Sequence, residues 1–193
     1  MESLRGAELK EYVRGILFCF GAPTIKGLKA ATLLNIRRGS EDVRAMWTAH
    51  GSEWLDPLGV DWILLNEETD SRNALALIYR RDILERALMD ENAARVLSLL
   101  DYPVPDVEGC LRRLRVRYRQ EFPHEIGFFL DYPPDDVMCF MEHPEAKCRM
   151  AGYWKVYGDV KKARCAFRRY RCAEREAAWS LLNGTPCGSA VNL

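Results

Sequence analysis

The sequence predicts an α+β fold: a single compact domain with a small, mostly antiparallel sheet of three to four strands and about seven helices. Two extended runs, residues 60–67 and 73–80, flank a polar turn, which is the pattern of a β-hairpin. Several longer segments carry apolar residues at helical spacing. Because strand and helix patterns do not alternate strictly, the sequence argues against a doubly wound parallel sheet.

The first part of the chain predicts a helix, a short strand and a second helix. The segment LKEYVRGILFCF has apolar residues at helical spacing and precedes Gly21 and Pro23, where we expect the helix to end. The run TLLNI, residues 32–36, is a candidate strand. Residues 40–55 predict a helix for which Ser40 is a natural N-cap.

The remainder of the chain predicts mostly helices. We expect helices over residues 81–100, 106–119, 124–131 and 134–142, then a strand over 152–158 and a long helix from Asp159 to about Leu182. We expect the domain to span residues 1–183, with residues 184–193 as a flexible C-terminal tail.

The composition narrows the class of protein. Apolar residues make up 48% of the chain and charged residues 29%, as in an ordinary globular protein. Lys plus Arg and Asp plus Glu number 28 each, so no net field attracts nucleic acid or an anionic membrane. The N-terminus lacks a signal-peptide pattern and no apolar run is long enough to span a bilayer. We therefore expect a cytoplasmic protein whose seven cysteines are thiols.

The segment HEIGFFLDYPPDDV, residues 124–137, has the outline of a DNA-binding helix-turn-helix. The second helix of such a motif must face phosphates and base edges. Here that helix begins with Asp135 and Asp136, whose carboxylates would repel a polyanion. Both carboxylates also favour a helix N-terminus electrostatically, which is a simpler role. The sequence therefore argues against DNA recognition by this segment.

His124 and Glu125 form the first pair of candidate site residues. An imidazole beside a carboxylate is the composition of an acid/base pair. Neighbouring residues on a helix do not face each other, so the two would converge on a site only through a third group. The alternative is structural: Glu125 complements the helix dipole and His124 lies at the surface.

The segment GYWKVYGD, residues 152–159, is the densest aromatic part of the chain. Strand alternation predicts Tyr153, Lys155 and Tyr157 on one face, with Trp154 and Val156 on the other face in the core. An ammonium between two phenols is suited to recognise an anion or a carbonyl group. The alternative is that Lys155 only extends along the sheet to reach water.

The final helix carries a basic ridge. Asp159 is its expected N-cap, and this carboxylate would compete with a phosphate for the free amides. Four arginines recur at helical spacing along one side, namely Arg164, Arg168, Arg171 and Arg175. The ridge is suited to an acidic partner or an RNA backbone, or it is a solvated face neutralised by acidic neighbours.

The cysteines and histidines show no metal-binding pattern. No two cysteines have Cys-x-x-Cys spacing, and no Walker, Gly-x-Ser-x-Gly or His-Glu-x-x-His motif is present. Cys148 precedes the aromatic strand and is the thiol that we expect to be most reactive. With His124 it is a candidate nucleophile pair, provided that the two meet in space. The sequence names no metal and no cofactor.

Three segments together resemble one bacterial family: CFGAPTIKGLKAATL, FPHEIGFFLDYPPDDV and GYWKVYGDVKKARCAFRRYRC. They are similar to the family known only as domain of unknown function 3793, over nearly the whole chain. This resemblance carries no established activity. It points to a role for Lys29, His124, Glu125, Tyr153, Trp154, Lys155, Tyr157, Gly158 and Asp159. It also implies a cysteine where this chain has Ala151 and a glycine where it has Asp131.

The leading hypothesis is a binding or accessory domain for an unknown small molecule or protein. Its ligand-binding candidates are Lys29, His124, Glu125, Tyr153, Lys155, Tyr157 and Asp159. The first alternative is a hydrolase-like enzyme that uses a Cys/His or His/Glu pair, and the second is nucleic-acid binding through the arginine ridge. Whether the protein is an enzyme stays open. The leading hypothesis requires that His124 and Lys155 line one concave pocket.

Overall fold

The central strand of the fold is β3 (Ala74–Tyr79), all of whose residues are buried. In the computed structural model, which describes residues 2–67 and 72–184, β3 lies between β1 (Ala31–Ile36) and β2 (Asp61–Leu64). Both neighbours pair antiparallel with it, and the register places Leu77 opposite Leu33 on one side and Ile63 on the other. The predicted hairpin and the predicted strand near residues 32–36 are both confirmed.

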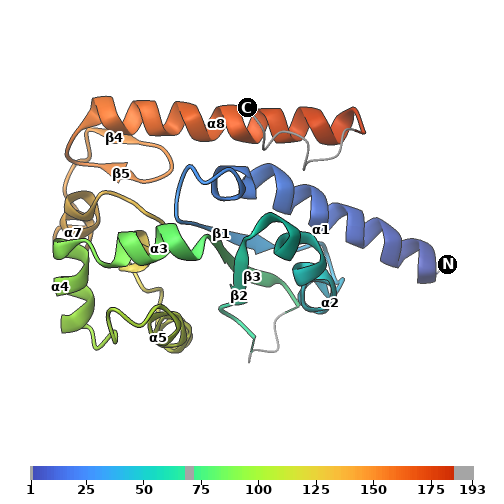
Figure 1. The fold of residues 1–193 in the computed structure, drawn as a ribbon, viewed down its shortest axis with the longest axis horizontal. Coiled ribbons are helices and arrows are strands. Elements are labelled where there is room, and N and C mark those ends of the chain that lie inside the picture. Colours follow the sequence, from blue (N-terminus) through green and yellow to red (C-terminus); the bar gives the residue numbers. More distant parts are fainter. Residues whose placement is uncertain (1, 68–71, 185–193) are drawn as a thin grey trace.

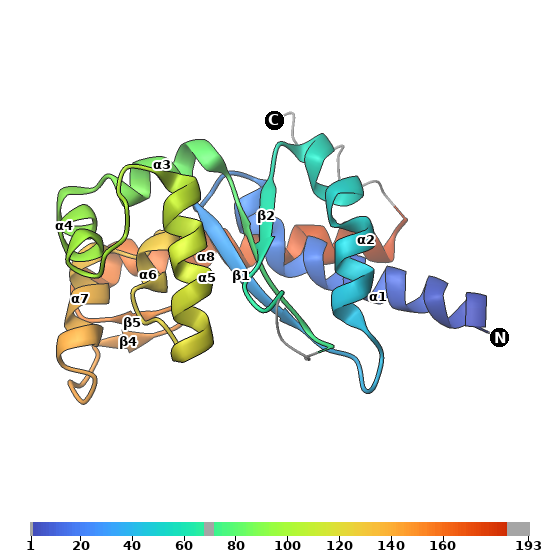
Figure 2. The same ribbon diagram turned by 90° about the horizontal axis from the view of Figure 1, so that it is seen from below.

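The sheet separates two hydrophobic cores. Ala74, Ala76 and Ile78 of β3 face one core, and the alternating Leu75, Leu77 and Tyr79 face the other, as the two-residue period of a strand requires. The first core is closed by α1 (Glu2–Ile25) and α2 (Val43–Leu55), and the second by the helices from α3 to α7 (Figures 1 and 2). Both sheet faces are therefore buried.

The first helix runs further than predicted. α1 continues past Gly21 and Pro23 and ends at Ile25. Gly21 is a site of close approach rather than a stop, because a Cβ at this position would lie 2.7 Å from Cδ1 of Ile78. The N-cap of α2 is Asp42, which accepts a hydrogen bond from the amide of Ala45, so the predicted cap at Ser40 was wrong. A 3₁₀ turn (Asp56–Leu58) follows α2.

The helices of the second core are shorter and more numerous than predicted. The expected helix over 81–100 is divided into α3 (Arg81–Leu88) and α4 (Glu91–Leu99), because Asp90 caps a new helix start. Three more helices complete this core: α5 (Val107–Gln120), α6 (Ile126–Phe129) and α7 (Pro134–Glu142). They gather at one end of the molecule (Figure 2).

The predicted strand over residues 152–158 is the largest error in the secondary structure. Only β5 (Lys155–Val156) is extended, and it pairs with β4 (Met150–Ala151) in a separate two-stranded sheet. The long helix α8 (Val160–Leu182) follows as predicted and lies beside α1 (Figure 1), where Ala22 meets Ala173 and Ala177. Small residues at this contact let the two helix backbones approach closely.

The α+β class and the small antiparallel sheets are confirmed, with eight α-helices among the described residues. No helix in the described part of the chain combines the length and the apolar character needed to cross a membrane. The domain boundary at residue 183 stays a prediction. Apart from Gly184, the predicted flexible tail lies outside the described residues.

Candidate functional site

The β4–β5 hairpin is attached to α7 by one buried carboxylate. Asp136 accepts three hydrogen bonds of 2.8 Å, from Nε1 of Trp154 and from the backbone amides of Tyr157 and Gly158. These amides therefore bond to a side chain instead of extending the strand, which explains why β5 ends at Val156. The attachment also fixes the ring of Trp154 at the surface of α7.

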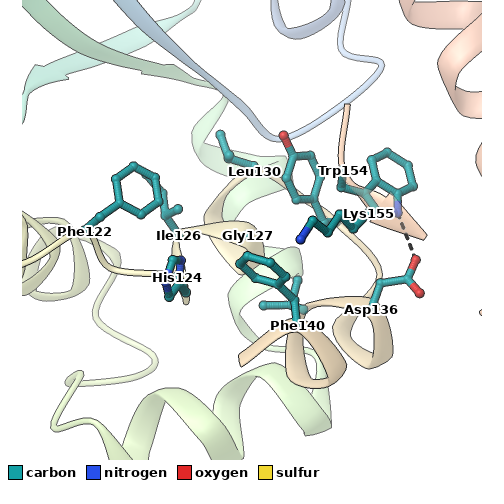
Figure 3. A pocket seen from close by; sticks show the side chains of 11 residues that line it. Phe122, His124, Ile126, Gly127, Leu130, Asp136, Phe140, Trp154 and Lys155 are labelled. Atoms are coloured by element: carbon teal, nitrogen blue, oxygen red, sulfur yellow. Dashed lines mark hydrogen bonds between the residues drawn. The ribbon is translucent and has the colours of Figure 1, made fainter. Parts of the chain in front are cut away.

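Beside this attachment lies a pocket of about 280 Å³, which we call the His124–Lys155 pocket. It lies between the segment before α6, helices α6 and α7, and the hairpin (Figure 3). Phe140 connects its two candidate polar groups: the His124 ring meets it edge-on at 5.1 Å between centroids, and Nζ of Lys155 lies 4.8 Å from its centroid. The lining residues are Phe122, His124, Ile126, Gly127, Leu130, Tyr132, Asp136, Val137, Phe140, Trp154 and Lys155.

The pocket lining is mostly apolar and aromatic, and its ionisable nitrogen groups are those of His124 and Lys155. Figure 3 shows the Lys155 amine directed toward Phe140, whereas the oxygens of Asp136 turn to the indole N–H of Trp154. Among the described residues no carboxylate reaches Lys155 at ion-pair distance. An aromatic cleft with an unpaired ammonium at its edge is suited to an apolar body that carries one anionic group.

Glu125 does not join His124 in this pocket. Its carboxylate is buried and accepts hydrogen bonds from the hydroxyl of Tyr102, at 2.9 Å, and from Nε of Arg117. Burial, together with the Glu125 charge, raises the pKa of Tyr102 well above its usual value. Glu125 therefore cross-links α5 to the start of α6, and the structure does not bring it to His124 as an acid/base pair.

Tyr153 and Tyr157 also diverge from Lys155. The Tyr153 hydroxyl donates to Oε2 of Glu174 on α8 at 2.8 Å, and burial followed by this hydrogen bond raises its pKa. The Tyr157 hydroxyl oxygen is buried without a hydrogen-bond partner among the described residues. The predicted face of two phenols around an ammonium was wrong, because it depended on a continuous strand that does not form.

Lys29 lies in a second cavity, which we call the Lys29 cavity. This cavity measures about 510 Å³, and its lining includes Tyr153 and Glu174. The Lys29 side chain is buried, with Nζ 5.3 Å from the ring centroid of Tyr132 and 5.6 Å from that of Tyr170. Burial lowers the pKa of Lys29 to about 8, against the opposing charges of Asp131 and Glu174. Tyr132 lines both cavities and forms part of the wall between them.

The remaining candidate and substituted positions have structural surroundings. Asp159 caps α8 as predicted, because its carboxylate accepts hydrogen bonds from the backbone amides of Lys161 and Lys162. These bonds, above all the one from Lys162, lower the pKa of Asp159. Ala151, where the resemblance implies a cysteine, is exposed in β4 and lines neither cavity. Asp131 has φ 60°, in the left-handed region that favours the glycine implied at this position.

The two alternatives, nucleic-acid binding and an enzyme with a Cys/His pair, involve residues outside both cavities. The four ridge arginines Arg164, Arg168, Arg171 and Arg175 are exposed, and no carboxylate among the described residues pairs with them. Cys148 is half-buried and lines neither cavity. In the described part of the chain no three His, Cys, Asp or Glu side chains gather closely enough to hold a metal ion.

Sequence reasoning missed the residues that organise both cavities. Asp136 was assigned to the helix N-terminus, yet it is buried while its neighbour Asp135 is exposed. Neither Phe140 nor Tyr132 was among the predicted site residues, yet both line the His124–Lys155 pocket. Glu174 is an acidic residue within a strongly basic helix, which was the available signal that its carboxylate has a specific partner.

The comparisons with known proteins identify a family but no characterised relative. No curated protein and no solved structure matches the chain. One family model matches residues 17–189, which includes every candidate site residue. The chain therefore belongs to the family described as Protein of unknown function (DUF3793).

Proposed function

We propose that this protein is a binding domain whose His124–Lys155 pocket takes a small amphipathic molecule with a flat apolar body and one carboxylate. The observation that carries the proposal is the convergence of His124 and Lys155 on one aromatic pocket. The pocket volume of about 280 Å³ is near the lower end of the range for small-molecule sites, so the ligand is small.

The charges favour an anionic group at the pocket edge. Lys155 is exposed, and in the part of the chain that the structure describes its one partner is the face of Phe140, at 4.8 Å. A cation–π contact at an exposed site contributes only about 0.5–1 kcal/mol. A ligand carboxylate can therefore pair with the Lys155 ammonium, either in place of its contact with Phe140 or in addition to it. The aromatic rings of Phe122, Phe140 and Trp154 supply the surface for the apolar body.

A pair of matched ligands tests the proposal by isothermal titration calorimetry. We expect 2-naphthoate to bind two- to five-fold more tightly than neutral 2-naphthylmethanol, because an exposed charge pair contributes roughly 0.5–1 kcal/mol. The substitution Lys155→Met keeps the aliphatic stem and should abolish this preference. The substitution Phe140→Ala should weaken both compounds, because both pack against the ring.

The control variant is Lys161→Met, which removes an exposed ammonium from α8 that lines neither cavity. It should leave both affinities unchanged. If Lys155→Met keeps the full preference for naphthoate, or if neither compound binds the wild-type protein, the proposal is wrong.

The unpaired arginine ridge on α8 supports a second candidate function, which is binding of a polyanion such as RNA. Four exposed guanidinium groups on one helix side concentrate positive charge although the chain as a whole is neutral. Retention on an immobilised polyanion should then fall steeply with salt, and Arg168→Gln together with Arg171→Gln should reduce this slope. Elution of the wild-type protein at low salt would exclude this function.

A further inference from the structure

Lys29 is a buried amine without a close counter-ion among the described residues. The residue lies between α1 and β1, and its side chain is 4% exposed. Its nearest charged neighbours, Asp131 and Glu174, act on it electrostatically, but among the described residues no carboxylate reaches it at ion-pair distance. Buried lysines are ordinarily paired, so an amine held only by two tyrosine rings needs another explanation.

The cavity around the Lys29 amine is lined by apolar side chains and by a few polar ones. Phe20, Pro23 and Leu130 supply apolar walls to the Lys29 cavity. The same lining includes Glu174 and Tyr153, whose hydroxyl is bonded to the Glu174 carboxylate at 2.8 Å. Residues that carry an amine, a carboxylate and a hydroxyl therefore line one space of about 510 Å³. These groups are separate from the His124–Lys155 pocket, whose lining contains none of the three.

The charges near Lys29 determine which class of ligand can approach its amine. An anionic ligand would approach Lys29 against the negative charges of Glu174 and Asp131. A neutral carbonyl compound meets no such repulsion. When it condenses with the amine it forms an iminium ion, which keeps the single positive charge of the ammonium that it replaces. The faces of Tyr132 and Tyr170 that now contact the ammonium would stabilise the iminium in the same way.

We propose that Lys29 captures a neutral apolar aldehyde or ketone as an imine within the Lys29 cavity. The neutral amine attacks the carbonyl carbon and a C–N bond forms; the nitrogen then loses a proton and the carbonyl oxygen gains one, which gives a neutral carbinolamine. The nitrogen lone pair then expels this oxygen as water after a second protonation. Overall, an ammonium and a carbonyl compound give an iminium and water, so charge and atoms balance without an oxidant or reductant.

Glu174 is the group that carries protons in this step. Its carboxylate does not reach Lys29 at ion-pair distance, so in this proposal it takes the proton from the ammonium and delivers it to the departing oxygen through a bridging water, while the Tyr153 hydroxyl holds the carboxylate in position. The lowered pKa of Lys29, at about 8, supports the same chemistry. Near pH 7 it leaves a neutral fraction on the order of a hundred-fold larger than that of an ordinary lysine.

Reductive trapping on the full chain tests the proposal. The protein is incubated with benzaldehyde near neutral pH, sodium cyanoborohydride reduces the iminium to a stable benzylamine, and peptide mass spectrometry quantifies each lysine. We expect Lys29 to be labelled at least about ten-fold faster than the exposed Lys161, because more of its amine is neutral. Labelling of Lys29 at or below the rate of Lys161 would overturn the proposal.

Two further comparisons distinguish the proposed capture at Lys29 from the general reactivity of a neutral amine. 4-Carboxybenzaldehyde has the same ring with an added negative charge, and it should label Lys29 several-fold more slowly than benzaldehyde does; a faster reaction would contradict the charge argument. Glu174→Gln should slow labelling of Lys29 and leave that of Lys161 unchanged. Equal labelling of Lys29 in Glu174→Gln would remove Glu174 from the mechanism. Lys155→Met should have no effect, so this test is independent of naphthoate binding.

Discussion

Replacing Glu125 by Gln removes the charge from the cross-link between α5 and α6. In the wild-type protein the buried carboxylate accepts from both the Tyr102 hydroxyl and the Arg117 guanidinium. Both bonds reach the same oxygen, Oε1, so the carbonyl oxygen of the variant can still accept them, but the negative charge that pairs with Arg117 is lost. Arg117 is then left with Glu121, a partner that is 71% exposed.

The expected loss of stability follows from these contacts. A hydrogen bond to a charged group contributes roughly 1.5–3 kcal/mol, and removing one partner of a buried ion pair costs roughly 3–5 kcal/mol. Because Gln keeps a carbonyl oxygen but not the charge, the loss should lie at the lower end of the second range, and we expect Glu125→Gln to lower the free energy of unfolding by about 3 kcal/mol.

Glu121→Gln is the matched control, because it changes the other carboxylate on the same arginine. This pair is a surface i,i+4 contact with N···O 3.6 Å, so the loss should stay below about 0.5 kcal/mol. Urea denaturation followed by circular dichroism measures both variants. If the two losses agree within about 0.5 kcal/mol, Glu125 does not stabilise the fold as described, and a role at His124 has to be considered again.

Three further predictions concern the two cavities and the β4–β5 hairpin. Asp136→Ala leaves three N–H groups without their acceptor and should lower the free energy of unfolding by about 3 kcal/mol in urea; no change would contradict the attachment of the hairpin. The pKa of Lys29 is about 8 when folded and 10.5 in its unperturbed form, so the unfolded chain binds more protons between these values and stability rises with pH. The stability of the wild-type protein relative to Lys29→Met should therefore increase by on the order of 1 kcal/mol from about pH 7 to about pH 9; a decrease would refute the lowered pKa. Gly152→Ala places a Cβ 2.1 Å from the ring of Phe167 and should cost about 2 kcal/mol, whereas Gly15→Ala, with open space around it, should stabilise α1 slightly; equal thermal shifts would contradict the packing.

The elements with local signals could be predicted from the sequence. The hairpin of β2 and β3 follows from two apolar runs around a polar turn, and α8 follows from an N-cap and a regular apolar stripe. The strand over residues 152–158 could not be predicted correctly, because the signal was aromatic alternation. In the structure those rings pack on Phe167 and Tyr132, and Asp136 takes the backbone amides that a strand would have paired.

The site depended even more on contacts between distant parts of the chain. The structure does place His124 and Lys155 at one pocket, whereas their role in binding a ligand stays a prediction. Glu125 diverges because its partner Tyr102 lies 23 residues earlier in the chain, and nothing near Glu125 in the sequence reveals this contact. Lys29 was pointed out only by the family resemblance, since its burial between two tyrosine rings arises from segments that are far apart in sequence.

The most direct measurement is an NMR titration of the isotope-labelled protein with 2-naphthoate. The indole N–H of Trp154 is bonded to Asp136 at the wall of the His124–Lys155 pocket, so its signal reports on that pocket. We predict saturable shifts of this signal and of the His124, Phe140 and Lys155 resonances. Shifts confined to other parts of the protein, or none at all, would contradict a binding site at this pocket.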